Sequence, residues 1–176
     1  MTKRCFVSID LPPYARDYVA SLARRDIYWI KWVKPENFHI TLSFLGDLTP
    51  ERIADTRALL SDISQFYKPF ILKLTELRTN LDMLWLLPEY ERILDDLADE
   101  LKAKLRGARI GKRERRSYTP HILLGRSKTG RHMRQVIENF EPAEFTVDRI
   151  NLYESELTPG AATHKLIESF KFPDEN

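Results

Sequence analysis

Two histidines lie in similar surroundings and could take part in one reaction. His39 begins the segment HITL and His121 begins the segment HILL, about half a chain length further on. An imidazole has an ordinary pKa of about 6.5, so it can give or take a proton near neutral pH. A strand histidine taken singly is more often structural than catalytic. The hypothesis of a duplicated unit with one imidazole from each copy therefore depends on the pairing.

Strand geometry places a hydroxyl beside the first histidine. Residues 38–44 alternate apolar and polar side chains, which is typical of a β-strand. His39 and Thr41 then project from the same face, and the Thr41 hydroxyl can donate a hydrogen bond to an anionic oxygen. Two such units facing each other would offer an acid, a base and oxyanion donors around one phosphate. Hydrolysis of a phosphodiester with an alkoxide leaving group needs this set.

The elements that must position these residues are mixed. Apolar runs predict strands at residues 5–11, 38–44, 70–74, 83–87, 120–125, 144–155 and 164–172. Helices are predicted after Pro12-Pro13, from Thr49-Pro50 onward, and over residues 89–105, where apolar residues recur at helical spacing. Strands follow one another without a regular alternation with helices, which favours an α+β fold with largely antiparallel sheets.

Two segments of the chain are harder to assign. The polar segment from Lys128 to Arg134 is expected to run into a short helix. Within residues 144–155, Phe145 and Val147 share one parity while Ile150 and Leu152 share the other. We expect a β-bulge near residues 148–149 to reconcile the two parities in one strand.

Composition limits the classes of function. With 176 residues and 43% hydrophobic content, the chain can bury a core. It has no apolar run of the roughly 20 residues that span a bilayer and no signal-peptide pattern, so we expect a cytoplasmic protein without membrane contact. The single cysteine, Cys5, excludes an internal disulfide and a thiolate-rich metal site. The net charge is only +2, so local cations must hold any phosphate ligand. The basic loop at residues 112–116 lies just before the second motif and is a candidate electrostatic guide for an anionic ligand.

The two motifs and their flanks carry a family resemblance. The similarity lies in residues 4–12, residues 32–46, the segment Thr119-Pro120-His121 and the tail from Phe145 to Leu157. There the chain is similar to the RNA 2′,3′-cyclic phosphodiesterases. These are also called the 2′-5′ RNA ligase family, within the two-histidine phosphoesterases. The resemblance covers nearly the whole chain. It implies that residues 1–176 form a single α+β domain of two pseudo-symmetric lobes of largely antiparallel sheet, with helices on the outer faces and a cleft between the lobes.

The resemblance also implies an activity and roles for residues. It implies hydrolysis of an RNA or nucleoside 2′,3′-cyclic phosphate to a 2′-phosphate, with no metal and no cofactor, by a protein that we expect to be monomeric. His39 matches the proton donor to the departing 3′ oxygen, and His121 matches the base that activates water. Thr41 matches a phosphate-binding hydroxyl, and Arg126 occupies the place of an arginine that contacts phosphate.

One position departs from the family pattern. Where the second motif normally repeats threonine, this chain has Leu123. Alternation places Leu123 on the face of His121, so the cleft loses a hydroxyl donor, and we expect the reaction rate to fall by a factor of about 10²–10³.

Two alternatives to hydrolysis stay open: joining of RNA ends through a 2′-5′ linkage by the reverse chemistry, and a weakly active or inactive module that binds RNA ends or nucleotides. His132 and His164 are interpreted as exposed or structural, and Trp32 and Trp85 as core residues.

Overall fold

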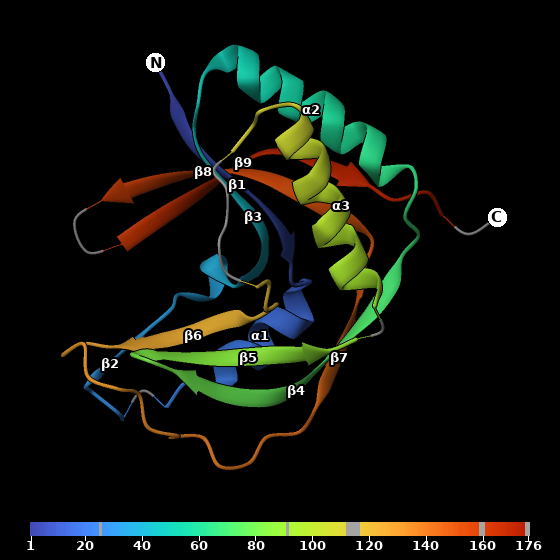
Figure 1. The fold of residues 1–176 in the computed structure, drawn as a ribbon. Helices are drawn as coiled ribbons and strands as arrows, with labels where there is room; N and C mark the ends of the chain where they lie inside the picture. The colour runs from blue at the N-terminus through green and yellow to red at the C-terminus, as the bar shows by residue number, and fades with distance from the viewer. Residues whose placement is uncertain (25, 91, 112–116, 159–160, 175–176) are drawn as a thin grey trace.

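The fold was analysed in a computed structural model, which describes residues 1–24, 26–90, 92–111, 117–158 and 161–174. Within these ranges the chain forms one nine-stranded antiparallel sheet with three α-helices and one 3₁₀ helix (Figure 1). The strands are β1 (Lys3–Asp10), β2 (Ile30–Trp32), β3 (His39–Leu48), β4 (Phe70–Asn80), β5 (Met83–Glu89), β6 (Ile122–Ser127), β7 (Ala143–Val147), β8 (Arg149–Thr158) and β9 (Ala161–Lys171). The helices are α1 (Pro13–Ser21), α2 (Pro50–Ser64) and α3 (Ile93–Gly107), with the 3₁₀ helix η1 at Pro35–Asn37.

The sheet divides at its centre into two halves, which we call lobes: β7-β4-β5-β6 and β3-β1-β8-β9. Its strands run β7-β4-β5-β6-β3-β1-β8-β9, and β2 pairs with β6 outside this path. The two strands that carry the histidine motifs, β3 and β6, are therefore the central pair. They meet antiparallel with Ile40 opposite Ile122, the residue that follows the histidine in each motif. Each half of the sheet thus contributes its motif strand to the centre, and the expected α+β fold with largely antiparallel sheet is confirmed.

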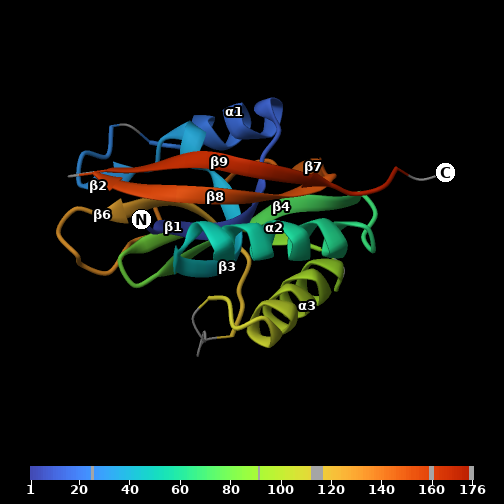
Figure 2. The same cartoon turned by 90° about the horizontal axis from the view of Figure 1, so that it is seen from above.

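The helices connect the two lobes. α1 follows β1 of one lobe but packs against β7 of the other, and α3 follows β5 but packs against β3 and α2 of the opposite lobe. Figure 2 shows α1 on the opposite side of the sheet from α2 and α3. The buried faces of sheet and helices form one continuous hydrophobic core. This crossing arrangement makes the two motif strands parts of one packed body.

Local sequence signals account for the helix α2. Its N-cap is Thr49, whose Oγ1 accepts a hydrogen bond from the Arg52 backbone N at 3.4 Å, and Pro50 is its first residue, as predicted. The prediction for α3 began too early. Glu89 ends β5 opposite Lys73, and the helix begins at Ile93.

Two expectations were wrong. Residues 128–134 form a turn and irregular chain rather than a short helix. The segment from Ala143 onward is two strands rather than one strand with a bulge. The chain leaves the sheet's edge at Asp148, so that β7 pairs with β4 and β8 pairs with β1. The opposite parities belong to strands in different lobes. Within the described residues, no helix is both long and apolar enough to cross a membrane.

Candidate functional site

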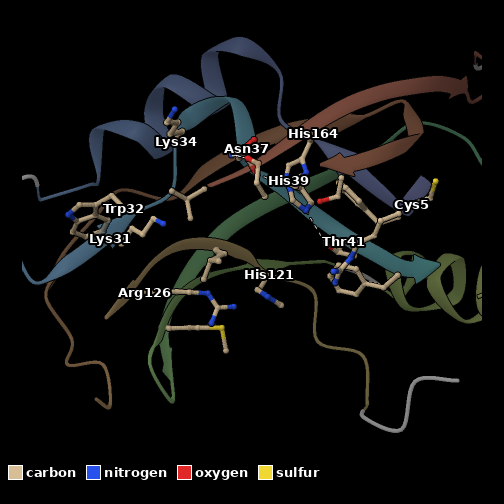
Figure 3. A pocket seen from close by; sticks show the side chains of 18 residues that line it. Cys5, Lys31, Trp32, Lys34, Asn37, His39, Thr41, His121, Arg126 and His164 are labelled. Atoms are coloured by element: carbon tan, nitrogen blue, oxygen red, sulfur yellow. Dashed lines mark hydrogen bonds between the residues drawn. The ribbon is translucent and has the colours of Figure 1, made fainter. Parts of the chain in front are cut away.

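The predicted site residues line one cavity. This open cavity has a volume of about 450 Å³. His39 and Thr41 reach it from β3, while His121, Leu123 and Arg126 reach it from the β6 segment (Figure 3). Alternation along β6 predicted that Leu123 shares the face of His121, and both side chains do line the cavity. Residues from the two halves of the chain therefore enclose a single space.

Matching irregularities in β3 and β6 decide which side chains reach the cavity. In β3 the pairing with β1 passes from Thr41 to Ser43 and skips Leu42, and in β6 the pairing with β5 passes from Leu123 to Gly125 and skips Leu124. Such a β-bulge changes the parity of the residues after it. Arg126 consequently lines the cavity, although strict alternation would turn it away from His121.

Backbone carbonyls fix the orientation of the two imidazoles. His39 Nδ1 lies 2.7 Å from the Asn37 carbonyl oxygen, and His121 Nδ1 lies 2.8 Å from the Thr119 carbonyl oxygen. A carbonyl oxygen can only accept, so in both rings Nδ1 carries the proton. In the neutral ring Nε2 is then a base. The Nε2 atom of His39 lies 3.0 Å from Thr41 Oγ1, which joins the motif's imidazole and hydroxyl.

Aromatic rings hold each imidazole differently. Trp85 stacks on His121 with ring centroids 3.9 Å apart and planes 16° apart. Phe6 packs against His39 at 5.0 Å between centroids, with the planes tilted by 35°. Trp85 and Leu123 therefore give His121 apolar surroundings, whereas His39 also has a hydroxyl neighbour.

Charged neighbours distinguish the two histidines. Burial lowers the pKa of His39 below its ordinary value, and the hydrogen bond to Asn37 and the Asp10 carboxylate oppose that change. Burial also lowers the pKa of His121, the bond to Thr119 opposes it, and the Arg126 guanidinium lowers it further. Both motif histidines thus have a lowered pKa: Asp10 and His121 act in opposite directions on His39, while Arg126 adds to the lowering at His121.

The rest of the lining combines cations with apolar surface. The cationic side chains around the cavity are Arg4, Lys31, Lys34 and Arg126, and no carboxylate lines it among the described residues. Arg126 also forms an ion pair with Asp82 at 3.5 Å. Apolar lining comes from Phe6, Trp32, Val33, Phe44, Met83 and Leu123. In the described part of the chain, no three His, Cys, Asp or Glu residues cluster as a metal site would require. The cavity thus offers cationic and apolar surface side by side.

Comparison with known proteins identifies the family. Residues 28–159 match the 2′-5′ RNA ligase superfamily. The chain belongs to this superfamily. Curated relatives include proteins named RNA 2′,3′-cyclic phosphodiesterase from Methanothermobacter thermautotrophicus, with 28% identity over 97% of this chain and all of the relative, and from Aquifex aeolicus, with 30% identity over 80% of each.

Solved structures show the same fold. A protein from Thermus thermophilus superposes with a TM-score of 0.78 at 25% identity, covering 98% of this chain and all of that one. E. coli LigT complexed with 3′-AMP gives a TM-score of 0.82 at 24% identity, covering 98% and 99% of the two chains. The likeness to LigT is evidence for the superfamily fold over almost the whole length.

Sequence reasoning missed three residues at the site, two that line the cavity and one that stacks on a motif histidine. Trp32 packs against the core, as predicted, and also lines the cavity, whereas Trp85, which was assigned to the core, stacks on a motif histidine. His164 lines the cavity, and no local motif marks it. The Trp85 position could have been found from its place on the strand beside the second motif, whereas His164 depends on long-range pairing. His132 is exposed, in agreement with its interpretation. The basic loop at residues 112–116 lies outside the described residues.

Proposed function

We propose that this protein hydrolyses the 2′,3′-cyclic phosphate end of RNA, or a nucleoside 2′,3′-cyclic phosphate, to a 2′-phosphomonoester. One observation carries the proposal: both motif imidazoles bind a backbone carbonyl through Nδ1 and line the same cation-rich cavity. This arrangement leaves two Nε2 atoms for one phosphoryl group. The names of the curated relatives support the same activity.

The reaction needs one proton accepted and one delivered. His121 Nε2 removes a proton from water as the water oxygen attacks phosphorus. The bond between phosphorus and the 3′ oxygen breaks, and His39 Nε2–H delivers its proton to that oxygen. The second hydrogen of the water stays on the new phosphate oxygen, so the product is a 2′-phosphomonoester with a free 3′-hydroxyl. Exchange with solvent then restores both imidazoles.

The charged neighbours support this division of roles. A general acid must start protonated and a general base must start neutral. Asp10 favours the charged form of His39, and Arg126 opposes the charged form of His121. The Asp10 and Arg126 charges therefore support the roles of acid for His39 and base for His121, as the family pattern does, while burial and His121 act against the charged form of His39.

Phosphate binding falls to fewer donors than the family pattern provides. Thr41 Oγ1 lies beside the acid, and the Arg126 guanidinium lines the cavity near the base. Leu123 offers no hydrogen bond in the place of the second hydroxyl. The cationic lining and the absence of carboxylates among the described lining residues suit a phosphate better than a divalent cation, and we propose a metal-independent reaction. Because each lobe supplies one histidine, we also propose that the two lobes act as one unit.

Turnover of 2′,3′-cyclic AMP tests the proposal. The protein is incubated with this nucleotide, with and without EDTA, and the products are separated by chromatography. We expect 2′-AMP rather than 3′-AMP, at a rate that EDTA leaves unchanged. His39→Ala and His121→Ala should each abolish turnover, while His132→Ala, at an exposed histidine outside the cavity, should retain it. Full activity in either cavity variant would contradict the assignment of roles.

The same assay separates the alternatives. Tight nucleotide binding without a monoester product would make the protein a binding module. Supplying an RNA with a 2′,3′-cyclic end and a second RNA with a 5′-hydroxyl tests for the reverse reaction. A joined product formed faster than the hydrolysis product would make end joining the main activity.

A further inference from the structure

A third imidazole lies in the cavity and takes no part in the mechanism above. His164, on β9 opposite Ser155 of β8, lines the same cavity as the two motif histidines. Its ring centroid lies 5.3 Å from that of His39, with the planes 86° apart, and 4.9 Å from that of Phe6. Figure 3 shows His164 and His39 together on one side of the cavity, with His121 and Arg126 on the other. Any phosphate that meets His39 is therefore close to His164.

The two ring nitrogens of His164 have different surroundings. Nδ1 is buried and has no hydrogen-bond partner among the described residues. His164 and His39 also line a second cavity of about 30 Å³, together with Asp10, Arg16, Glu36 and Tyr153. Arg16 Nε is buried without a partner in the same described part of the chain. This polar cavity has room for one water molecule, which can accept from His164 Nδ1–H and donate to a carboxylate. His164 Nε2 is then the nitrogen left for a ligand in the larger cavity.

The charges around His164 make its protonation depend on the ligand. Burial lowers the pKa of His164, proximity to His39 lowers it further, and Asp10 opposes both. In the small cavity it shares the lining with His39 from β3, Asp10 from β1, Arg16 from α1, Glu36 from η1 and Tyr153 from β8. In the larger cavity it shares the lining with His121, Cys5 and the four cations Arg4, Lys31, Lys34 and Arg126, which oppose a positive charge on the ring. Tyr153 Oη donates to Asp10 Oδ2 at 2.5 Å. Burial and His39 thus disfavour the charged form of His164, and the Asp10 carboxylate favours it.

A phosphomonoester changes this balance. Its second ionisation has a pKa near 6, so at neutral pH it carries close to two negative charges, whereas a phosphodiester carries one. The additional charge favours a second imidazolium on the His39 side of the cavity, because opposite charges at this range favour the charged form of a histidine. We propose that His164 is a third phosphate-binding imidazole, which takes a proton from solvent at Nε2 when a phosphomonoester dianion occupies the cavity and then donates a hydrogen bond to a non-bridging phosphate oxygen.

This role adds a donor on the His39 side of the cavity, whereas Leu123 leaves the His121 side without its hydroxyl. The proton returns to solvent when the ligand leaves, so the overall reaction is unchanged. Because charge also builds up on the phosphoryl oxygens during water attack, the same donor stabilises the transition state more than the cyclic diester. The inference depends on the proposed function only in that the 2′-phosphomonoester is the natural product.

Calorimetric titration with 2′-AMP tests the inference without turnover. The titration is performed at pH 7 in buffers of different ionisation enthalpy, because the dependence of the measured heat on the buffer gives the number of protons taken up. We compare the parent protein with His164→Gln and with the matched control His132→Gln. The cavity variant should take up fewer protons and bind about tenfold or more weakly, as expected for loss of a charge-assisted hydrogen bond. The control should match the parent.

Equal proton uptake and equal affinity in His164→Gln would overturn the inference. A second measurement needs no variant: NMR titration of the His164 ring in the parent, with and without 2′-AMP. Its pKa should rise when the nucleotide binds, and an unchanged pKa would also overturn the inference. Both measurements report binding alone. A protein that binds 2′-AMP with His164-dependent proton uptake but hydrolyses no cyclic nucleotide would refute the proposed function and leave this inference standing.

Discussion

Residues of one type behave differently in this cavity because their neighbours differ. Among its three histidines, His39 has Thr41 Oγ1 at 3.0 Å and an Asp10 carboxylate nearby. His121 instead has Trp85 stacked on its ring and the Arg126 guanidinium close by. The two motif histidines are related by position and both have a lowered pKa, but a carboxylate opposes that lowering at His39 and a guanidinium adds to it at His121.

Replacing Leu123 by threonine should restore a missing donor. Leu123 lines the cavity beside His121, so a hydroxyl there would face the phosphate. A hydrogen bond to a charged oxygen contributes about 1.5–3 kcal/mol, and we expect kcat/KM for 2′,3′-cyclic AMP to rise by about tenfold or more in Leu123→Thr. Leu123→Val is the matched control, since valine has the shape of threonine without the hydroxyl. A similar gain in both variants would attribute the effect to space rather than to hydrogen bonding.

The pH profile should respond in opposite directions to two charge removals. The Asp10 carboxylate raises the pKa of His39, so Asp10→Asn lowers it. A general acid is lost as pH rises through its pKa, and the alkaline limb of kcat/KM should therefore move to lower pH.

Arg126 lowers the pKa of His121, so Arg126→Gln raises it. A general base is lost as pH falls through its pKa, and the acidic limb should move to higher pH.

These shifts are independent of how far the maximum rate falls. Kinetics of 2′,3′-cyclic AMP hydrolysis over a range of pH measure both limbs, and His132→Gln provides a control for histidine content. If Asp10→Asn moved the acidic limb instead, the roles of His39 and His121 would be exchanged.

At the scale of elements, the sequence predicted faces well wherever a strand is regular. Alternation placed His39 with Thr41 and Leu123 with His121, and these side chains do line the cavity. It could not place Arg126, because the bulge at Leu124 is a property of the pairing between β5 and β6. It also merged β7 and β8, since only their different partners reveal the break at Asp148. The position of His164 in the cavity depends on β8 and β9, which come last in the chain.

The close contact between β2 and β6 gives a prediction for stability. A Cβ atom added at Gly125 would lie 2.7 Å from Ile30 Cγ2 and 3.2 Å from the Lys31 carbonyl oxygen. Ile30 is 3% exposed and cannot move away freely. We expect Gly125→Ala to lower the free energy of unfolding by about 1–3 kcal/mol, measured by urea denaturation.

Two further variants separate crowding from other effects. Gly107→Ala is the matched control, because an added Cβ there meets nothing within 4 Å and alanine favours the end of α3. Its free energy of unfolding should stay the same or rise. In the double variant Ile30→Ala/Gly125→Ala, the loss should be smaller than the sum of the two single losses, because the clash with Ile30 is gone. Additive losses would argue against the contact.

The whole molecule combines a nearly neutral chain with a strongly cationic cavity. The net charge is +2, yet Arg4, Lys31, Lys34 and Arg126 all line the same space. These cations come from β1, β2, the segment before η1, and β6, so the folded arrangement rather than the composition concentrates them. Attraction of an RNA end should accordingly be local, with a salt dependence set by a few side chains.

Salt dependence of an RNA substrate tests this view of the whole molecule. For a short RNA ending in a 2′,3′-cyclic phosphate, kcat/KM should fall as the salt concentration rises. The reason is that counterions leave the RNA phosphates when the cavity's cations bind them, and added salt opposes this release. Lys34→Gln removes one exposed cation from the lining and should reduce the slope of log kcat/KM against log salt by about 0.7, the value for one phosphate contact with a single strand. With 2′,3′-cyclic AMP, which has no further phosphates, the slope should change little. Lys68→Gln makes the same charge change at an exposed lysine outside the cavity lining and should behave as the parent. Equal slopes for all three proteins on the RNA would show that the strand leaves the cavity by a path that does not pass Lys34.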